Sequence, residues 1–382
     1  MSLTTYIGNQ SNILGESPLY ARLIKLQRPV LTDDELHRLE QIGEKDFRAE
    51  VLPMEFESGG GGRALRAALE KLAADAVNAV RGGSRILVLS DRKIGSDRTP
   101  IPSLLATAAV NRALVAAGLR PEVGLVIQSG EVREIMHYAL LLGFGATAIN
   151  PYLALESVSD LARTGAIKPD PVAAAGNYIN AVDKGLLKVM SKMGISTLRS
   201  YRSAQIFEAV GLSRELIDSC FPGTASRIGG IGLEEIAAEA DARSVAARHP
   251  GSQPGAGLLD EGGQYRYRRN GENHLWTPAS LAAFRQAVQE NNPEKYREYA
   301  ALINSQAEHL CTLRGLFEFA PATPVPLEEV EPVESIVRRF VSGAMSLGSL
   351  SPEAHEAIAV AMNRLGGMSN CGEGGEDPAR YV

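Results

Sequence analysis

The sequence predicts an α/β fold, in which a parallel sheet is covered by helices. Apolar runs alternate with helical patterns between residues 85 and 152, which is the rhythm of βαβ units. The apolar runs are nearly continuous, as in strands that are buried on both faces. Polar residues or glycine follow each run, in SDRKIGSD, QSGE and NPY. Because ligands usually bind at this end of a parallel sheet, these loops are the first places to search for a site.

Capping and glycine signals predict the elements before this region. Residues 1–30 are expected to form a mixed, extended lead-in. Glu35 follows Thr32 at the spacing of a capping box, which predicts a helix over 32–42. Three further segments are expected next: a strand over 51–56, a glycine break over 58–62 and an amphipathic helix over 63–83.

The alternating region itself contains three expected strands and two expected helices. Their ranges are 85–91, 122–130 and 146–152 for the strands, and 102–119 and 131–145 for the helices.

From residue 153 to residue 250 the chain is predicted to be mostly helical. Helices are expected over 177–194 and 233–249, whereas residues 195–212 are expected to begin as a strand and to become helical. The segments that follow are a glycine-rich boundary or hairpin over 251–276 with a turn at Asn270-Gly271, a helical stretch over 280–310 that Pro293 interrupts, and a Pro- and Glu-rich linker over 321–336.

Composition narrows the classes of function. A length of 382 residues predicts roughly two or three domains, and 45% hydrophobic residues allow a large core. The net charge of −6 argues against a nucleic-acid surface. RYRR at 266–269 is the densest basic stretch. A solvated hairpin edge is the favoured interpretation, and a phosphate contact is the alternative. No apolar run approaches the roughly 20 residues that span a bilayer, and no secretory signal is expected, because the first residues lack a basic stretch followed by an apolar core.

Cysteine and histidine spacing gives no metal site. The three cysteines, Cys220, Cys311 and Cys371, are far apart and form no CxxC pair. They predict neither a disulfide framework nor a closed zinc or iron–sulfur site, and they fit a reducing cytoplasm. The six histidines form no HxH or HExxH motif.

The loop SDRKIGSDRTPIPS at 90–103 follows a strand and precedes a helix. Its polar residues could bind an anion at the helix N-terminus. The favoured alternative is a polar crossover loop, in which Asp91 and Asp97 pair with Arg92 and Arg98.

Two further segments have a functional and a structural interpretation. RSYRSAQIF at 199–207 is either a phosphate or carboxylate clamp, built on Arg199 and Arg202, or an ion-paired strand-to-helix turn. FPGTASRIGGIG at 221–232 has the composition of a phosphate cradle but contains neither GxGxxG nor GxxxxGK[ST], so a helix-terminating loop is favoured.

The segment 343–377 is the most informative part of the chain. Small residues in GAMSLGSLS let a backbone lie flat against a planar ligand. Ser351-Pro352-Glu353 predicts a helix start, and Gly366-Gly367 predicts its end. SNCGEGGED then presents acidic side chains on a glycine-rich backbone, which favours a ligand loop about as strongly as a plain surface loop.

The run SGAMSLGSLSPEAHEAIAVAMNRLGGMSNCGEGGEDPARY closely resembles the opening of the FMN-binding synthase domain of the glutamate synthase family. Cys371 departs from the Thr or Ser that is usual in the family and is small enough to keep the turn. Other segments resemble the central domain of the family, from about residue 18 onward: LSDRKIGSDRTPIPSLLATAAVNRALVAAGLR, ALLLGFGATAINPYLALESV, NYINAVDKGLLKVMSKMGISTLRSYRSAQIFEAVGL, FPGTASRIGGIGLEEIA and HLWTPASLAAFRQAV.

The resemblance implies a domain organisation. The central domain would be barrel-like, with parallel strands and covering helices, and would hold no cofactor of its own. The opening strand and helix of a second (β/α) barrel would follow it. The expected boundaries are a lead-in at 1–30, the central domain at 31–320, the linker at 321–336 and the first part of the FMN-binding domain at 337–382.

The resemblance also implies a reaction, in which glutamine, 2-oxoglutarate and a reductant give two molecules of glutamate. FMN and an iron–sulfur cluster would serve the complete enzyme. Its partners would be a glutaminase domain and the rest of the FMN domain, with a small NADPH-oxidising subunit or ferredoxin as electron donor. This chain would supply part of the site: Ala344, Met345 and Ser346 at the flavin edge, and Gly372, Glu373 and Gly374 on the substrate side.

The family's catalytic N-terminal cysteine and cluster cysteines have no counterparts here, so the chain is expected to be an inactive fragment that binds no cofactor. Residues 369–382 would then form a disordered tail. Two alternatives stay open: a self-contained barrel-like protein that holds a phosphorylated ligand with the SDRKIGSD and FPGTASRIGG loops, and a non-catalytic scaffold for separate subunits.

Overall fold

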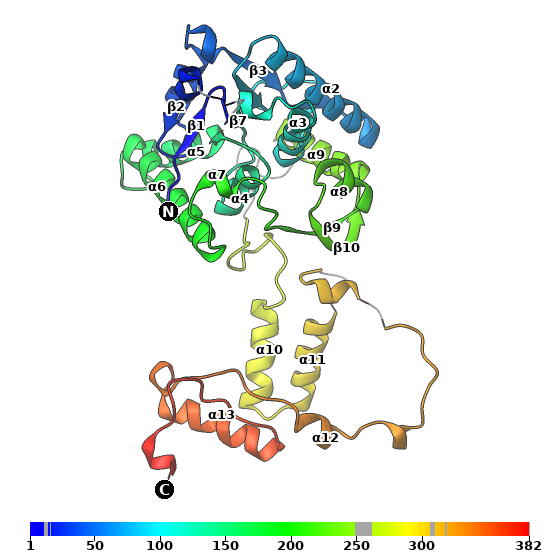
Figure 1. Cartoon of the computed structure of the whole chain (residues 1–382). Coiled ribbons are helices and arrows are strands. Elements are labelled where there is room, and N and C mark those ends of the chain that lie inside the picture. The colour runs from blue at the N-terminus through cyan, green and yellow to red at the C-terminus, as the bar shows by residue number, and fades with distance from the viewer. Residues whose placement is uncertain (11–13, 16, 249–261, 306–309, 318, 382) are drawn as a thin grey trace. The chain divides into compact units, whose positions relative to one another are not determined.

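The computed structural model describes residues 1–10, 14–15, 17–248, 262–305, 310–317 and 319–381. The chain divides into two compact units, Met1–Leu258 and Leu259–Val382 (Figure 1). No helix among the described residues is both long enough and apolar enough to cross a membrane.

A four-stranded parallel sheet forms the centre of the first unit, which confirms the predicted α/β class. The strands are β3 (Ala49–Pro53), β5 (Ile86–Ser90), β7 (Gly124–Gln128) and β8 (Ala148–Asn150), in that spatial order. Every residue of β5 and β7 is buried, as the continuous apolar runs predict. In the described part of the chain this row of four strands does not close on itself.

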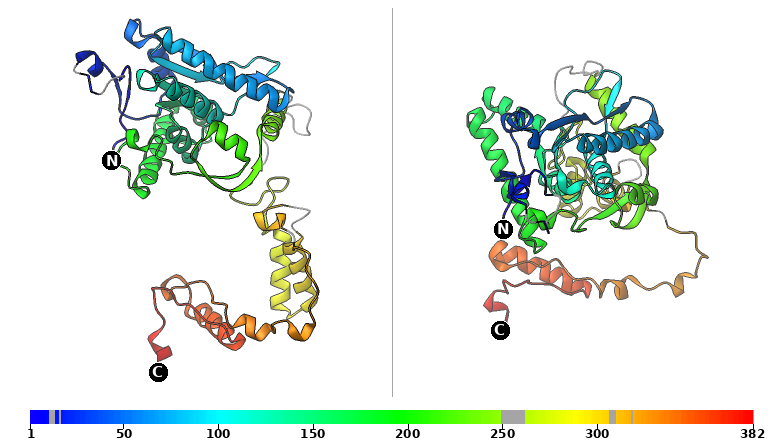
Figure 2. Two further views of the ribbon diagram at one scale, coloured as in Figure 1. Left: turned by 45° about the vertical axis from the view of Figure 1, so that its right-hand side comes forward. Right: turned by 45° about the horizontal axis from the view of Figure 1, so that its top comes forward.

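Two hydrophobic clusters cover the two faces of the sheet, because successive side chains of a strand point in opposite directions. Leu87 and Leu89 of β5 pack with α2 (Gly61–Arg81) and α3 (Ser103–Ala116) in the larger cluster. Ile86 and Val88 belong to the smaller cluster, with α1 (Asp33–Glu40). The helices α2 and α3 pack against each other on their side of the sheet (Figure 2).

Two helix starts are predicted in the segment that precedes β5. One is confirmed, and the other lies two residues earlier than predicted. Thr32 and Glu35 form the capping box of α1. The helix α2 begins at Gly61, inside the expected glycine break, because the Glu234 carboxylate accepts from the Gly62 amide at 2.7 Å. The predicted strand 51–56 divides into β3 and β4 (Glu55–Glu57), and β4 pairs antiparallel with β6 (Arg98–Pro100).

At the N-terminus, β1 (Thr5–Ile7) and β2 (Ile24–Leu26) form a small antiparallel pair within the expected extended lead-in. Helix α4 (Ile135–Gly143) follows β7, as predicted. After β8 come three helices: α5 (Tyr152–Arg163), α6 (Pro171–Lys192) and α7 (Leu198–Tyr201).

Two predictions beyond residue 194 are wrong. Residues 195–212 begin helically with α7 and end as strand β9 (Glu208–Leu212), the reverse of the expected order. The expected loop at 221–232 contains strand β10 (Ala225–Ile231), which pairs in parallel with β9 across α8 (Arg214–Cys220). Gly230 packs against the backbone of Gly211, an approach that a side chain would block, so glycine here serves strand pairing.

Helices dominate the second unit. Helix α10 (Pro278–Gln289) packs against α11 (Pro293–Asn304), so the interruption at Pro293 is confirmed. Phe284 of α10 and Tyr299 of α11 have ring centroids 5.1 Å apart. The chain turns at Asn270 with no strand over 262–276, while the rest of the predicted boundary segment, 251–261, lies outside the described residues.

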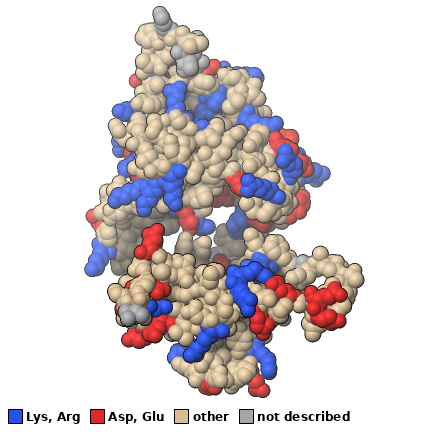
Figure 3. Space-filling view, turned by 60° about the horizontal axis from the view of Figure 1, so that its bottom comes forward, with Lys and Arg blue, Asp and Glu red and all other residues tan. Residues whose placement is uncertain are grey.

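The last part of the second unit contains α12 (Val333–Val337) and α13 (Pro352–Leu365). The domain boundaries at 30, 320 and 336 stay predictions. On the face in Figure 3, basic and acidic side chains form separate small groups on a largely uncharged surface.

Candidate functional site

The segments on either side of α13 lie next to each other. Val341 forms a parallel bridge with Met368. The Ser342 amide donates to the Met368 carbonyl at 3.0 Å, and the Met345 amide donates to the Asn370 carbonyl at 3.2 Å. The two segments therefore run side by side, connected by the helix between them.

The predicted start and end signals of α13 are confirmed. They place the segment after the helix beside the segment before it. Ser351 caps the helix by accepting from the Ala354 amide at 3.3 Å. Gly366 ends it in the left-handed region, with φ of 80°. The buried side of the helix contains His355 and Ala359, whereas Leu365 at its end is 61% exposed.

This arrangement brings the two predicted groups of site residues together. A Cβ atom on Gly372 would lie 3.5 Å from the Cβ of Ala344 and 3.8 Å from the Met345 amide nitrogen. A Cβ atom on Gly374 would lie 2.5 Å from the Cβ of Ser346. Glycine is thus needed at 374 for the loop to approach, while Glu373 is exposed between the two glycines.

A chain of polar contacts holds the end of the loop against this surface. The buried His355 ring contacts the Met345 carbonyl through Nε2 at 3.2 Å and Arg380 through Nδ1 at 3.1 Å. Because a guanidinium only donates, Nδ1 accepts and Nε2 carries the proton. Arg380 also pairs with Glu376 at 3.6 Å. Residues 369–381 are therefore tied into the unit, and the prediction of a disordered tail is wrong for them.

The sheet edge of the first unit has a second polar cluster. The Ser90 hydroxyl donates to Gln128 Oε1 at 2.6 Å, and Gln128 Nε2 donates to Asn150 Oδ1 at 3.1 Å. Asn150 Nδ2 continues to Asp33 Oδ1 at 2.8 Å, at the start of α1. These bonds join the ends of three strands, and they satisfy the buried polar groups within the protein.

The predicted pairing of Asp91 with Arg92 is wrong. Asp91 accepts from the Ser129 hydroxyl at 2.6 Å and from the Gly130 amide at 3.0 Å, while burial raises the pKa of its carboxyl. Arg92 pairs instead with Asp33 at 2.9 Å and with Glu156. No ion pair joins Asp97 to Arg98 either, within the residues that the structure describes. A ≈ 570 Å³ cavity lies in front of this edge.

Residues 199–207 form neither the predicted anion clamp nor an ion-paired turn in the described part of the chain. Arg202 donates to the Thr5 hydroxyl at 3.1 Å, and desolvation lowers its pKa to about 10, with Arg199 adding repulsion. Arg120 is half-buried, like Arg202, and desolvation lowers its pKa to about 9. It donates to Asn111 Oδ1 and to two carbonyls, each at 2.7 Å. Its burial has no signal in the local sequence.

The loops SDRKIGSD and FPGTASRIGG line different cavities. The structure thus does not bring together the two loops on which the phosphorylated-ligand alternative depends. In the described residues there is also no group of three His, Cys, Asp or Glu side chains that could hold a metal ion.

Comparison with known proteins identifies relatives along the whole chain. It is 43% identical to a glutamate synthase [NADH] of Schizosaccharomyces pombe, 42% identical to a glutamate synthase [NADPH] large chain of Bacillus subtilis and 40% identical to that of Azospirillum brasilense. Each alignment covers 100% of this chain, but 18%, 24% and 25% of the respective relative. The chain therefore spans about a fifth to a quarter of the length of these relatives.

Among solved structures, the flavin-binding domain of baker's yeast flavocytochrome b2 aligns with 51% of this chain and 45% of its own, at 15% identity and a TM-score of 0.29. That likeness is too low to support an argument.

Two family profiles match the chain. The profile described as "Conserved region in glutamate synthase" matches residues 274–382, which include the candidate site. The profile described as "Glutamate synthase central domain" matches residues 1–213, so the resemblance extends to the N-terminus rather than starting near residue 18. On this match, the chain belongs to the glutamate synthase central domain family.

Proposed function

We propose that this chain works as the middle part of a glutamate synthase, which converts glutamine, 2-oxoglutarate and a reductant into two molecules of glutamate. The contact between the two predicted groups of site residues is the observation that supports this proposal most. Residues 344–346 and 372–374 are far apart in sequence, yet a Cβ atom on Gly374 would reach Ser346 at 2.5 Å. A glycine-lined surface of this kind suits a planar ligand and a small acid beside it.

The residues present fit one edge of a flavin. Gly343 and Ala344 are exposed and small, and nothing lies within 4 Å of the place where a Cβ atom on Gly343 would be. In this proposal the backbone of Ala344, Met345 and Ser346 lies along the flavin. Gly372, Glu373 and Gly374 face the substrate side, where the glycines leave room for it. Bound FMN, when reduced, supplies the hydride that converts an imine of 2-oxoglutarate to glutamate.

The chain's own residues hold this surface in position. His355 orients the Met345 carbonyl, and Arg380 fixes the ring by donating to Nδ1. Through Glu376, the same contacts hold the loop end that follows Gly374. These residues position the site and carry out no chemical step.

Residues 31–320 are proposed to act structurally, as a central domain between a glutaminase domain and the FMN domain, without a cofactor of their own. The satisfied polar network at the sheet edge supports this role. The proposed electron donor is an NADPH-oxidising small subunit or ferredoxin, and the complete enzyme would also hold an iron–sulfur cluster. The cytoplasm is the proposed location, which the wide spacing of the three cysteines in the sequence supports.

An absorbance scan of the purified chain between 300 and 550 nm, with and without added FMN, tests the proposed division of the site. We expect no flavin band to stay with the protein through a desalting column, because residues 337–382 supply one edge of the pocket. A retained stoichiometric band would contradict the proposal that the pocket needs further residues.

A further inference from the structure

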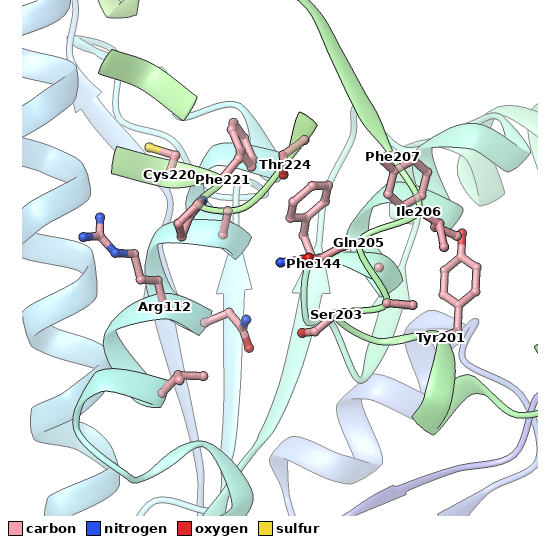
Figure 4. Close-up of a pocket in the computed structure, with 16 residues that line it drawn as sticks. Arg112, Phe144, Tyr201, Ser203, Gln205, Ile206, Phe207, Cys220, Phe221 and Thr224 are labelled. Carbon is pink, nitrogen blue, oxygen red and sulfur yellow. The ribbon is translucent and has the colours of Figure 1, made fainter. Parts of the chain in front are cut away.

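A second cavity, of ≈ 250 Å³, lies in the first unit. Its walls come from α3, the end of α4, the segment after α7 and the end of α8. Figure 4 shows Arg112 and Cys220 at one end, Tyr201 at the other and phenylalanine rings between them. The cavity takes no part in the proposed glutamate synthase site.

The middle of the cavity is aromatic. The ring of Phe144 has its centroid 5.8 Å from that of Phe207 and 5.1 Å from that of Phe221. Phe207 packs where a Cβ atom on Gly143 would be, so glycine makes room for this wall. Since a dry cavity of about 150 Å³ holds benzene, the present cavity has room for a ring with a short chain.

Two strained residues form one side of the cavity. Ser203 and Gln205 have φ of 59° and 52°, in the left-handed region. The other described non-glycine residues with positive φ are Asn270 and Asn291, and asparagine tolerates this region well. Strain of this kind persists where the surroundings enforce it, and it concentrates at ligand sites.

The end at Tyr201 has a polar group without a partner. Its hydroxyl is buried and makes no hydrogen bond within the described residues, and the side chain is 1% exposed. Burial raises the pKa of this hydroxyl to about 12, so it is neutral.

Arg112, an exposed residue of α3, lies at the opposite end. Arg112 donates to the Ser219 carbonyl and forms no ion pair in the part of the chain that the structure describes. Cys220 does not compensate this charge, because burial raises the pKa of its thiol. Asn111 also lines the cavity, and since its oxygen accepts from Arg120, its NH₂ group is left to donate.

An apolar middle with donors and a cation at one end matches one class of ligand. We propose that this cavity binds a small carboxylate with an aromatic body. The ring lies against Phe144 and its neighbours, and the carboxylate accepts from Arg112.

Titration of the full chain with 3-phenylpropanoate, followed by NMR and calorimetry, tests the proposal. 3-Phenylpropanamide has the same shape without the charge, and propanoate has the charge without the ring. We expect saturable binding of 3-phenylpropanoate, with shifts at Phe144 and Phe207. The amide should bind about tenfold more weakly, the usual effect of losing one charge-assisted hydrogen bond. Propanoate should not saturate at millimolar concentrations.

Two variants locate the charge recognition. Arg112→Met should weaken the binding of 3-phenylpropanoate about tenfold and leave the affinity for 3-phenylpropanamide unchanged. Arg81→Met, at an exposed arginine at the end of α2, is the matched control and should change neither affinity. The proposal is overturned if 3-phenylpropanoate does not saturate, if its shifts lie outside the cavity, or if Arg112→Met leaves its affinity unchanged.

Discussion

Gly374 lies against Ser346, so close that a Cβ atom on the glycine would be 2.5 Å from the Cβ of the serine and 2.7 Å from its Oγ. This contact joins the loop after α13 to the segment before it. It therefore joins two stretches of small residues into one surface, on which the proposed function depends.

Substitution of Gly374 should open this surface. Gly374→Ala forces the loop away from Ser346, and overpacking of this kind costs about 1–3 kcal/mol. The Met345 amide, which donates to Asn370, should then exchange its hydrogen about tenfold faster or more. Gly348→Ala is the control, because nothing lies within 4 Å of its added Cβ atom. Equal exchange rates in the two variants would show that the contact is not needed.

The His355 ring should carry its proton at Nε2 and accept at Nδ1. Arg380 can only donate to Nδ1, which leaves Nε2 to donate to the Met345 carbonyl. Long-range ¹H–¹⁵N NMR should show an unprotonated Nδ1. Arg380→Ala should weaken this tautomer preference, whereas Arg364→Ala, at an exposed arginine of α13, should not. A proton found on Nδ1 in the unmodified chain would refute the contact with Arg380.

Two tyrosines of the first unit should respond in opposite directions to loss of their hydroxyls. Tyr201→Phe removes a buried hydroxyl that lacks a partner, so it should raise the free energy of unfolding by about 1 kcal/mol. Tyr138→Phe removes a hydroxyl that bonds to Tyr178 at 2.8 Å, so it should lower the free energy by about 1 kcal/mol. Chemical denaturation followed by circular dichroism measures both. Destabilisation by Tyr201→Phe would mean that its hydroxyl has a partner.

Asp91 should make stability depend on pH. Burial raises the pKa of its carboxyl above the ordinary value of 3.8, so just above pH 3.8 the folded chain holds this proton more strongly than the unfolded chain. The contribution is fully present below pH 3.8 and is lost as the pH rises through the raised pKa. Asp91→Asn should remove this decline in unfolding free energy, and the exposed Asp97→Asn should keep it. An unchanged slope in Asp91→Asn would assign the decline to another group.

Local signals in the sequence predict local structure here. The Thr32–Glu35 capping box, the Ser351 cap and the Gly366 stop all appear where expected, because each depends on residues within one turn. The sequence does not predict strands β9 and β10. They depend on pairing with each other, and their glycines are typical of loops. Long-range burial, as at Arg120, leaves no periodic pattern to detect.

In the candidate site too, the sequence predicts local features but not tertiary contacts. The family resemblance indicated residues 344–346 and 372–374, but the sequence could not show that the two groups touch. It also missed His355, because the role of its ring depends on Arg380, which lies 25 residues further along the chain. The sequence predicts a disordered tail because it does not show tertiary contacts. In the structure, an ion pair and a contact with the His355 ring hold the tail.

A chimera tests the central claim most directly. This chain would replace the matching segment of the Bacillus subtilis large chain, to which it is 42% identical over its full length. The measurement is glutamine-dependent formation of glutamate from 2-oxoglutarate, per bound flavin. We predict that the chimera retains flavin and forms glutamate, that Gly374→Ala lowers this rate at least about fivefold, as an overpacking cost of about 1–3 kcal/mol implies, and that Gly348→Ala does not. A folded chimera that forms no glutamate, or equal rates in the two glycine variants, would contradict the account.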